Sequence, residues 1–477
     1  MINLSFFRSR RFLPALIALA ALAGSAGLFT WYKLFRRVTT YYADPAEHFK
    51  YGSIGVEAPA GIPYWIWLVL PRVFADKLPG PGGYVALGAS WEPGRELPVG
   101  FTKEIVGIPR VGVNCAGCHT ASVRLRPGEA PRLYAGGPSS RFMAQGYVRF
   151  LFACARDDRF NSKTIMNAIL AIYDMPFVDR VLYRYLIIPY TRREILKNER
   201  ENYYWMPERP DWGPGRTDMN PFQRQVLRLP DDHSIGSTDV MAIWNERAHK
   251  GMLYHSDGLN TTLVESVRSA ALSAGATKAS LDIASLDRVQ EYLSDLPAPK
   301  YPFPIDRPVA EKGSGVFQRE CAECHAFGGR RTGTVAPLEE VGTDPNRNRH
   351  WTPAAADAFN RWAAAYPWAF HNFRSSNGYV ALPLDGIWAR APYLHNGSVP
   401  SMRQLLTPPE ARVRVFYRGY DVYDPENLGF LSAGTEAEQA GFRYDARVKG
   451  NGNGGHLYGT ALSDLDKNAL IEYLKTL

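Results

Sequence analysis

The longest apolar stretch of the 477-residue chain covers residues 12–32 and contains no charged side chain. A helix rises about 1.5 Å per residue, so this stretch would span about 30 Å, the thickness of a bilayer core. The pattern predicts one N-terminal transmembrane helix. A cleaved signal peptide is the alternative, with residues 13–22 as its apolar part and a small-residue site at Gly24-Ser25-Ala26. Hydrophobicity that continues to Trp31 favours the uncleaved anchor.

Helical spacing of apolar residues also marks the C-terminal part of the chain. Gly313, Phe317 and Cys321 lie at i, i+4 and i+8, on one stripe of a helix. The chain ends in an amphipathic stretch, and Ser463 and Asp466 at its start resemble a capping box. We therefore predict one helix that leads into Cys321 and another at the C-terminus.

The middle of the chain contains further apolar runs. Residues 166–173 and 177–188 read as helices and are followed by a Pro/Gly-rich loop over residues 206–230. A Pro-rich stretch, residues 297–308, predicts a stiff linker. Together these patterns predict a mainly α chain.

Charge changes the picture only at the N-terminus. The net charge is +8, from 55 Lys and Arg against 47 Asp and Glu, which by itself would be compatible with nucleic-acid binding. Residues 1–37 hold six basic and no acidic residues, namely Arg8, Arg10, Arg11, Lys33, Arg36 and Arg37. Subtracting these six leaves 49 basic against 47 acidic residues, so we expect no nucleic-acid partner. Three basic residues lie on each side of the apolar stretch, so the positive-inside rule does not orient it.

Four of the five cysteines lie in two copies of one motif, Cys115-Ala116-Gly117-Cys118-His119 and Cys321-Ala322-Glu323-Cys324-His325. C-x-x-C-H is the attachment motif of c-type haem. Its two thiols reach the two vinyl groups of one porphyrin, and the histidine that follows binds the iron. A zinc ribbon would place two C-x-x-C pairs about 15–20 residues apart, whereas these lie 206 apart. We therefore predict two covalently bound haem c groups.

Internal similarity suggests two related haem modules. Residues 285–293 have a residue pattern like that of the C-terminal helix, and residues 244–263 are similar in sequence to residues 388–402. Glycine and proline shortly before Cys115 exclude a regular helix there. In the second module, docking of the terminal helix on the helix that leads into the motif would be the usual cytochrome c arrangement. The remaining cysteine, Cys154, is expected to be a small buried hydrophobe.

These features resemble the bacterial dihaem cytochrome c peroxidase superfamily and, within it, the rubber-oxygenase-like branch. The resemblance covers most of residues 85–477 and rests on both haem motifs and on residues 244–263, 301–304, 328–346, 391–401 and 454–459. It implies two cytochrome c-like haem domains with long loops, the first enlarged by residues 140–235. We expect a membrane anchor or signal at residues 1–40, a first haem module at 41–298 and a second cytochrome c domain at 299–477.

The resemblance also bears on the sixth ligands of the irons. In the peroxidases a Met follows the A-P-Y-x-H-D-G motif, but residues 406–410 hold no ligand here. Rubber oxygenases use a second His near the C-terminus, which His456 matches. His456 also lies in a glycine-rich loop that is flexible enough to place an imidazole over iron. His395 is the runner-up, and His255, taken as its counterpart in the first module, is a weaker candidate for the first iron.

For the other histidines and for four tryptophans, a structural role is expected in place of a functional one. Surface or hydrogen-bonded roles are expected for five histidines: His48, His233, His249, His350 and His371. Core or interface packing is expected for four tryptophans that are also candidates for an inter-haem electron path: Trp205, Trp212, Trp244 and Trp388. A Ca²⁺ between the modules is common in the peroxidases, where carbonyls beside the A-P-Y motif contribute. Arg390 and Pro392 stand there, and Arg390 departs from the usual small hydroxyl residue, which weakens this implication.

The resulting hypothesis is a haem-dependent oxidoreductase, peroxidase-like or rubber-oxygenase-like, in which one haem activates peroxide or dioxygen and the other stores or relays electrons. Its catalytic residues are not identified by the sequence. An apolar cover from residues 166–173 would suit dioxygen and a hydrophobic substrate. The alternative is a non-catalytic dihaem electron carrier. Expected partners are a redox protein or a quinol-side electron donor and the bacterial inner membrane. The haem domains would lie in the periplasm, or the whole protein would be soluble or secreted after signal cleavage.

Overall fold

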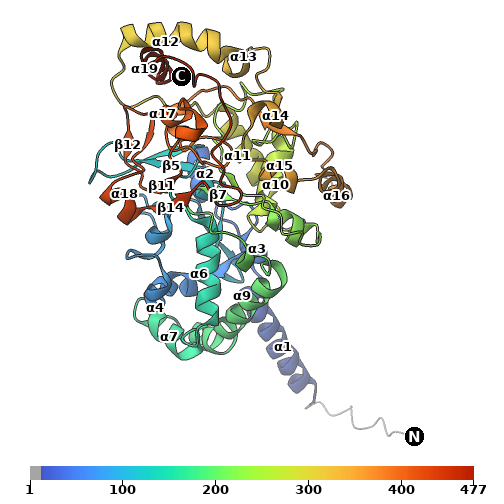
Figure 1. The fold of residues 1–477 in the computed structure, drawn as a ribbon. Helices are drawn as coiled ribbons and strands as arrows, with labels where there is room; N and C mark the ends of the chain where they lie inside the picture. Colours follow the sequence, from blue (N-terminus) through green and yellow to red (C-terminus); the bar gives the residue numbers. More distant parts are fainter. Residues whose placement is uncertain (1–11, 367, 369) are drawn as a thin grey trace.

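The first element of the protein is a long helix that stands apart from the rest of the chain. The computed structural model describes residues 12–366, 368 and 370–477. Helix α1 (Phe12–Leu34) projects away from the body (Figure 1). Its Pro14–Leu34 part is long and apolar enough to cross a membrane, and no other helix in the described residues is. The basic cluster of Arg8, Arg10 and Arg11 lies outside the described residues. The predicted apolar helix is present, as a membrane anchor or a signal peptide.

A four-stranded antiparallel sheet joins α1 to the body. Its order is β1-β3-β4-β2, with β1 (Arg37–Val38), β2 (Ile62–Pro63), β3 (Phe101–Val106) and β4 (Ile108–Val113). Only Gly107 separates β3 from β4, and its φ of +71° is a left-handed conformation that glycine adopts without strain. The Gly107 N–H donates to the Arg36 carbonyl at 2.7 Å. The end of α1 is thereby fixed to the sheet.

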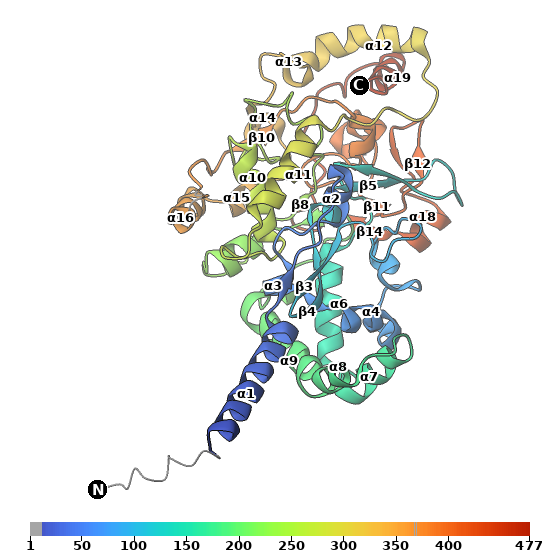
Figure 2. The same ribbon diagram turned by 180° about the vertical axis from the view of Figure 1, so that it is seen from behind.

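The helices of residues 140–235 form a layer at the end of the body from which α1 leaves (Figures 1 and 2). They are α6 (Ala144–Arg156), α7 (Ser162–Leu170), α8 (Phe177–Leu182) and α9 (Ile188–Asn202), with a π-helical turn, Tyr183–Ile187, between α8 and α9. Helix α4 (Tyr64–Val73) packs on α7. The core of this layer includes Cys154, which is fully buried as expected. The two predicted helices are confirmed, although the second continues through the π-helical turn into α9.

The second motif lies at the opposite end of the body, between α12 (Arg307–Glu320) and the loops that follow α13 (Ala322–His325) (Figure 1). Helix α19 (Asp464–Leu474) packs across α12 so closely that a Cβ on Gly313 would lie 1.8 Å from the Ala469 carbonyl oxygen. The rings of Phe317 and Tyr473 lie 5.2 Å apart across this contact. Ser463 caps α19 by accepting a hydrogen bond from the backbone N–H of residue 466. Both predicted helices and their docking are confirmed.

The first half of the chain contains a similar helix pair. Helix α2 (Pro45–Tyr51) packs on α11 (Ile283–Asp295), and the rings of Phe49 and Tyr292 lie 5.6 Å apart. No helix directly precedes the first motif, as predicted, because β4 occupies that place. The helix pair of the second half therefore has a counterpart whose first helix is separated from its motif by the sheet.

Both halves also contain the same turn, over residues 254–260 and 393–399. In each, the N–H of the first residue donates to the carbonyl of the last, at 2.9 and 2.7 Å. The second residue has a positive φ in each turn, 65° in the first and 68° in the second. The match places Ser256, and not His255, opposite His395. The expectation that His255 is the counterpart of His395 is wrong by one position.

The remaining elements are short, apart from two helices of medium length, and frame the loops. The helices are α3 (Glu57–Ala60), α10 (Leu263–Ser273), α14 (Leu338–Val341), α15 (Asn346–His350), α16 (Pro353–Ala363), α17 (Met402–Leu405) and α18 (Thr435–Ala440). The antiparallel pairs are β5 (Thr120–Val123) with β6 (Arg132–Ala135), β7 (Arg216–Thr217) with β8 (Thr238–Asp239), β9 (Val335–Pro337) with β10 (Gly378–Val380), β11 (Val415–Arg418) with β14 (Phe442–Asp445), and β12 (Tyr423–Asp424) with β13 (Gly429–Phe430). Helices outweigh strands, so the mainly α prediction is confirmed.

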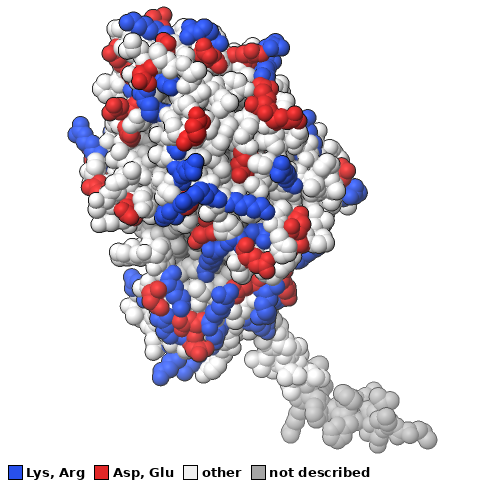
Figure 3. Space-filling view, viewed as in Figure 1, with Lys and Arg blue, Asp and Glu red and all other residues white. Residues whose placement is uncertain are grey.

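Charged side chains of both signs are interspersed over the face of the body seen in Figure 3. The described part of α1, by contrast, is uncharged up to Lys33. This distribution agrees with the nearly neutral body expected from the sequence, since no large basic surface dominates that face.

Candidate functional site

The first motif occupies the short helix α5 (Cys115–Cys118), directly after β4. Asn114 caps α5: its side-chain oxygen accepts the N–H of Ala116 at 3.0 Å. The Asn114 amide also donates to the carbonyls of Phe49 and Gly52, at 3.0 and 2.9 Å. One buried side chain thus ties the start of the motif to α2.

The second motif begins where α12 ends, and its histidine is the last residue of α13. The thiols of all four motif cysteines are free of disulfide bonds, as attachment of a haem requires. The two motifs differ in the element that precedes them, because the first follows a strand and the second follows a helix.

The two motif histidines are held in the same way. His119 Nδ1 lies 2.9 Å from the Met241 carbonyl oxygen, and His325 Nδ1 lies 2.7 Å from the Leu382 carbonyl oxygen. A carbonyl only accepts, so each Nδ1 carries the proton and each Nε2 keeps its lone pair. Burial lowers the pKa of His119 to about 4 and also lowers the pKa of His325. Both rings are therefore neutral, oriented and fit to bind a metal through Nε2.

The segments that hold these histidines are linked reciprocally to the two matching turns. The N–H of Asp239, two residues before Met241, donates to the His395 carbonyl at 2.7 Å. The N–H of Val380, two residues before Leu382, donates to the Ser256 carbonyl at 2.8 Å. Each histidine-holding segment is thus bonded to the turn of the other half.

His456 faces His325, with ring centroids 6.3 Å apart and ring planes at 40°. A metal–imidazole bond is about 2.0–2.1 Å long, and ring bonds of about 1.33 Å place the ring centre roughly 1.1 Å behind the nitrogen. Two imidazoles on opposite sides of one ion then have centres about 6.3 Å apart. Burial, with a smaller effect of His325, lowers the pKa of His456 to about 3, so this ring is also neutral. The centroid distance therefore fits two imidazoles that bind one ion, and the ligand role of His456 stays a prediction.

His395, the other candidate, lies in the second of the matching turns. Its ring stacks on Tyr379, with centroids 4.0 Å apart, and neither ring nitrogen has a hydrogen-bond partner among the described residues. Its carbonyl accepts bonds from Asp239 and from the Thr238 hydroxyl. His395 therefore anchors the junction between the halves, and its ligand role stays a prediction.

A cavity of about 1170 Å³ opens at the first motif. This volume exceeds the roughly 300–1,000 Å³ of typical small-molecule pockets. Cys115, Cys118 and His119 line it together with His255. Burial lowers the pKa of His255 to about 4, and its Nε2 has no hydrogen-bond partner among the described residues. The cavity therefore contains the donor set that a haem needs and a second neutral imidazole.

The apolar walls of this cavity differ from the expectation. Leu151 of α6, Ile195 of α9 and Val267 of α10 contribute to them, and residues 166–173 do not. Those residues pack instead in the neighbouring core, where Tyr173 stacks on Trp65 with centroids 3.9 Å apart. The predicted cover from residues 166–173 is wrong, because Ile187 at the end of the π-helical turn and side chains of α9 line the cavity instead.

The tryptophans are core residues, as expected. Trp205, Trp212, Trp244 and Trp388 are all buried. The indole N–H of Trp244 donates to the Asp385 carbonyl at 3.1 Å, and that of Trp388 donates to the Pro299 carbonyl at 2.6 Å.

Arg390, beside the A-P-Y motif, is largely buried and pairs with Asp385 at 2.6 Å. Its guanidinium also donates to the Pro383 carbonyl at 2.9 Å. A fixed positive charge therefore already stands at the place where the resemblance would put a Ca²⁺ ligand.

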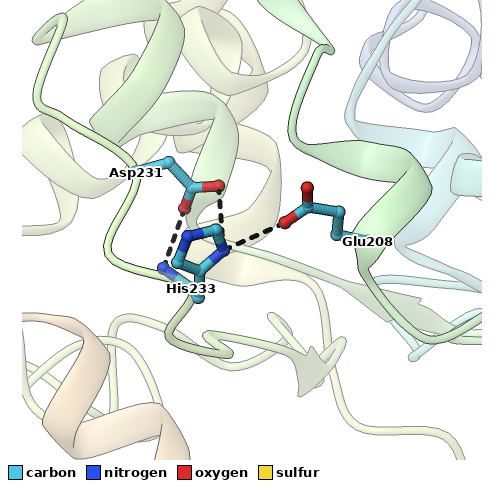
Figure 4. Close-up of side chains that lie close together, drawn as sticks. All are labelled: Glu208, Asp231 and His233. Carbon is cyan, nitrogen blue, oxygen red and sulfur yellow. Dashed lines mark hydrogen bonds and ion pairs between the residues drawn. The ribbon is translucent and has the colours of Figure 1, made fainter.

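Three side chains of metal-binding type also meet away from the motifs, namely Glu208, Asp231 and His233 (Figure 4). His233 is exposed and its Nδ1 lies 3.0 Å from a Glu208 oxygen. Asp231 is already paired with the buried guanidinium groups of Arg209 and Arg224. The cluster is therefore balanced without a cation, in agreement with the ordinary role expected for His233.

Comparison with known proteins supports a cytochrome. A family described as RoxA-like, cytochrome c-like matches residues 378–417, which include Leu382 and the turn at 393–399. The uncharacterized protein y4iM of Sinorhizobium fredii is 30% identical over 291 residues, covering 50% of this chain and 64% of that protein. The uncharacterized protein y4iJ of the same organism is 46% identical over 108 residues, covering 21% of this chain and 18% of that protein. The chain thus spans less than two thirds of either relative. A RoxA-like cytochrome c domain is present, and it implies a c-type cytochrome with covalently bound haem c.

Proposed function

We propose that the chain is an exported, membrane-anchored c-type cytochrome with two haems that acts as a redox enzyme. In this proposal the haem at the first motif reacts with peroxide or dioxygen. The haem at the second motif stores or relays electrons from a redox protein or a quinol-side donor. The chain would cross the inner membrane once, with both motifs in the periplasm.

The observation that carries this proposal is the difference between the two motif histidines. His325 is faced by a second imidazole at 6.3 Å, the spacing of two ligands on one ion, whereas His119 opens onto a cavity of about 1170 Å³. A six-coordinate haem suits electron transfer, and an open face suits reaction with a small molecule. The asymmetry therefore supports different roles for the two sites, reaction with a small oxidant at the first and electron transfer at the second.

The chain's own residues would orient and insulate the sites. Met241 and Leu382 hold the proton of the two ligand histidines on Nδ1. Haem, when bound, supplies an iron that exchanges electrons and, at an open face, binds small oxidants. Apolar side chains such as Leu151 and Val267 form part of the wall of the first cavity and would lower the polarity around a reactive centre there.

The second candidate function is a non-catalytic dihaem electron carrier. The observation in its favour is His255, whose unpartnered Nε2 belongs to the same cavity as His119. If this imidazole bound the first iron, both haems would be six-coordinate and neither would react with a ligand.

The optical and EPR spectra of the purified full chain, with and without added ligands, separate the two functions. The enzyme proposal predicts one low-spin haem that does not bind CO or cyanide and one haem that binds them. If both haems are low-spin and neither binds CO, cyanide or peroxide, the enzyme proposal fails and the carrier holds. His255→Ala would then open the first site, and His371→Ala is the matched control away from the cavity.

Three further measurements refine the enzyme proposal. Peroxide with an electron donor, against dioxygen with a polyisoprenoid, separates peroxidase from oxygenase turnover. Membrane fractionation with N-terminal sequencing of the mature protein separates an anchor from a cleaved signal. Mass spectrometry of the intact chain gives the number of attached haems, with two expected.

A further inference from the structure

One continuous helical segment, from α8 through the π-helical turn into α9, exposes large apolar side chains. Phe177 and Tyr185 are 78% and 72% exposed, and Val181 between them is also exposed. These three residues are spaced by four and lie on one side of the helix. With their exposed neighbours they form a surface that we call the α8–α9 face: Phe177, Val178, Val181, Tyr185, Leu186 and Tyr190. Contiguous exposed apolar residues of this kind mark an interaction site.

The α8–α9 face lies at the end of the body where α1 leaves it. Lys33, in the last turn of α1, forms an ion pair with Asp179 of α8 at 2.7 Å. Pairing of β1 with β3 and the bond from Gly107 to Arg36 fix the chain just after α1. Both ribbon views show α9 beside this end of α1, and Figure 2 also labels α8 in the same layer of helices (Figures 1 and 2). If α1 crosses a bilayer, the surface of that bilayer meets the body here.

The polar residues around the face have the chemistry of a membrane interface. Arg180, Arg184 and Arg193 are exposed along the same segment. The guanidinium of Arg184 lies 5.7 Å from the Tyr185 ring centre, and that of Arg193 lies 4.9 Å from the Tyr190 ring centre. Tyrosine is enriched at the headgroup level, and arginine beside an apolar face is attracted to anionic lipids. A solvent-exposed helix gains nothing from such a face, whereas lipid would bury it.

We propose that the α8–α9 face is a lipid-docking surface that lies in the membrane interface beside α1. The body then contacts the bilayer surface directly and is not attached to the membrane through α1 alone. The proposal rests on the membrane-anchored part of the proposed function and is independent of the haem chemistry. Its occupant is the headgroup and upper acyl region of the leaflet that α1 enters.

Spin labels on the full chain test this arrangement in vesicles of phosphatidylethanolamine and phosphatidylglycerol. Single cysteines replace Val181, Tyr185, Leu22 in α1, and Leu465 on α19, which is 82% exposed at the far end of the body. Cys154 is fully buried, and the motif cysteines are bonded to haem in the proposed function, so each label has one site. Nitroxide relaxation by dioxygen, which concentrates in lipid, is compared with relaxation by a water-soluble nickel chelate.

We expect labels at Val181→Cys and Tyr185→Cys to show a severalfold higher ratio of oxygen to nickel accessibility than Leu465→Cys, as Leu22→Cys does. If the label at Leu22→Cys shows the high accessibility ratio of a lipid environment while the ratio at Val181→Cys equals that at Leu465→Cys, docking is overturned and the membrane anchor is retained. If the label at Leu22→Cys also shows the low accessibility ratio of an aqueous environment, the membrane anchor is refuted, and docking beside α1 is refuted with it. Labels at Val181 and Tyr185 that are shielded from both reagents, or broadened by a second label, would mean a protein partner and overturn the lipid proposal.

Discussion

The imidazoles of His325 and His456 face each other with their ring centroids 6.3 Å apart. His325 ends a short helix, whereas His456 comes from the glycine-rich loop near the C-terminus. That loop is held by the buried Arg412, whose guanidinium donates to the carbonyls of Asn453 and Gly455, both at 2.8 Å. The hydrogen bonds of Arg412 therefore hold the loop that places His456 beside His325.

Replacement of His456 tests whether it binds the second iron. We expect His456→Ala to convert one haem per chain from low-spin to high-spin or water-ligated, because no other imidazole faces His325 among the contacts of the described residues. Optical and EPR spectra of the purified chain measure this change. His233→Ala, at an exposed histidine, is the control. An unchanged low-spin spectrum in His456→Ala would point instead to His395 or to a methionine.

Two glycines of α12 offer a matched test of the helix contact behind the second motif. A Cβ at Gly313 would lie 1.8 Å from the Ala469 carbonyl oxygen, whereas nothing lies within 4 Å of a Cβ at Gly315. We expect Gly313→Ala to lower the free energy of unfolding by about 3 kcal/mol, because α12 and α19 must move apart. Gly315→Ala should raise it by about 0.5–1 kcal/mol, since alanine favours the helix. Guanidinium unfolding followed at the haem absorbance gives both values, and equal effects of the two variants would refute the close contact.

The elements that the sequence predicted correctly have strong local signals. The stripe of Gly313 and Phe317, the Ser463 cap and the uncharged run of α1 each need only a few neighbouring residues to be recognised. The motif histidines follow from their spacing alone. His456 could be proposed because a histidine in a glycine-rich loop is unusual, and the resemblance pointed to the same residue.

The parts that the sequence missed depend on contacts between distant segments. The sheet that carries the first motif consists of strands of two to six residues, with Pro109 and Gly112 inside β4, so alternation is not visible. Helix α2 is separated from its motif by that sheet, and its correspondence to α12 appears only once it is seen to pack on α11, for example where Phe49 contacts Tyr292. The carbonyls of Met241 and Leu382 are backbone groups and leave no sequence signal. The one-residue error at His255 arose because the turns match in backbone conformation and not in histidine position.

Asn114 links the first motif to α2, so its replacement should act on the first site alone. Asn114→Ala removes the cap of α5 and two bonds to the carbonyls of Phe49 and Gly52, at a cost of about 2–4 kcal/mol. We expect incomplete haem attachment at the first motif and normal attachment at the second. Mass spectrometry of proteolytic peptides that contain each motif measures both. Asn114→Asp keeps the cap but loses the two donors, and it should fall between the parent chain and Asn114→Ala. Equal loss at both motifs would contradict a local role.

His249 makes stability depend on pH, because it lies between carboxylates of the two halves. Burial disfavours its charged form, but Asp385 and Glu246 outweigh burial and raise the pKa of His249 from 6.5 to about 9. A histidine whose pKa is raised in the folded state contributes stability that is fully present below its unfolded value of 6.5 and is lost as the pH rises through about 9. We therefore expect the thermal midpoint to fall between pH 6.5 and about pH 9 by more in the parent chain than in His249→Gln. The difference should be on the order of 2 kcal/mol in unfolding free energy. His371→Gln, at an exposed histidine outside this carboxylate pair, is the control variant. Parallel curves for the parent chain and His249→Gln would show that the carboxylates do not hold the imidazole charged.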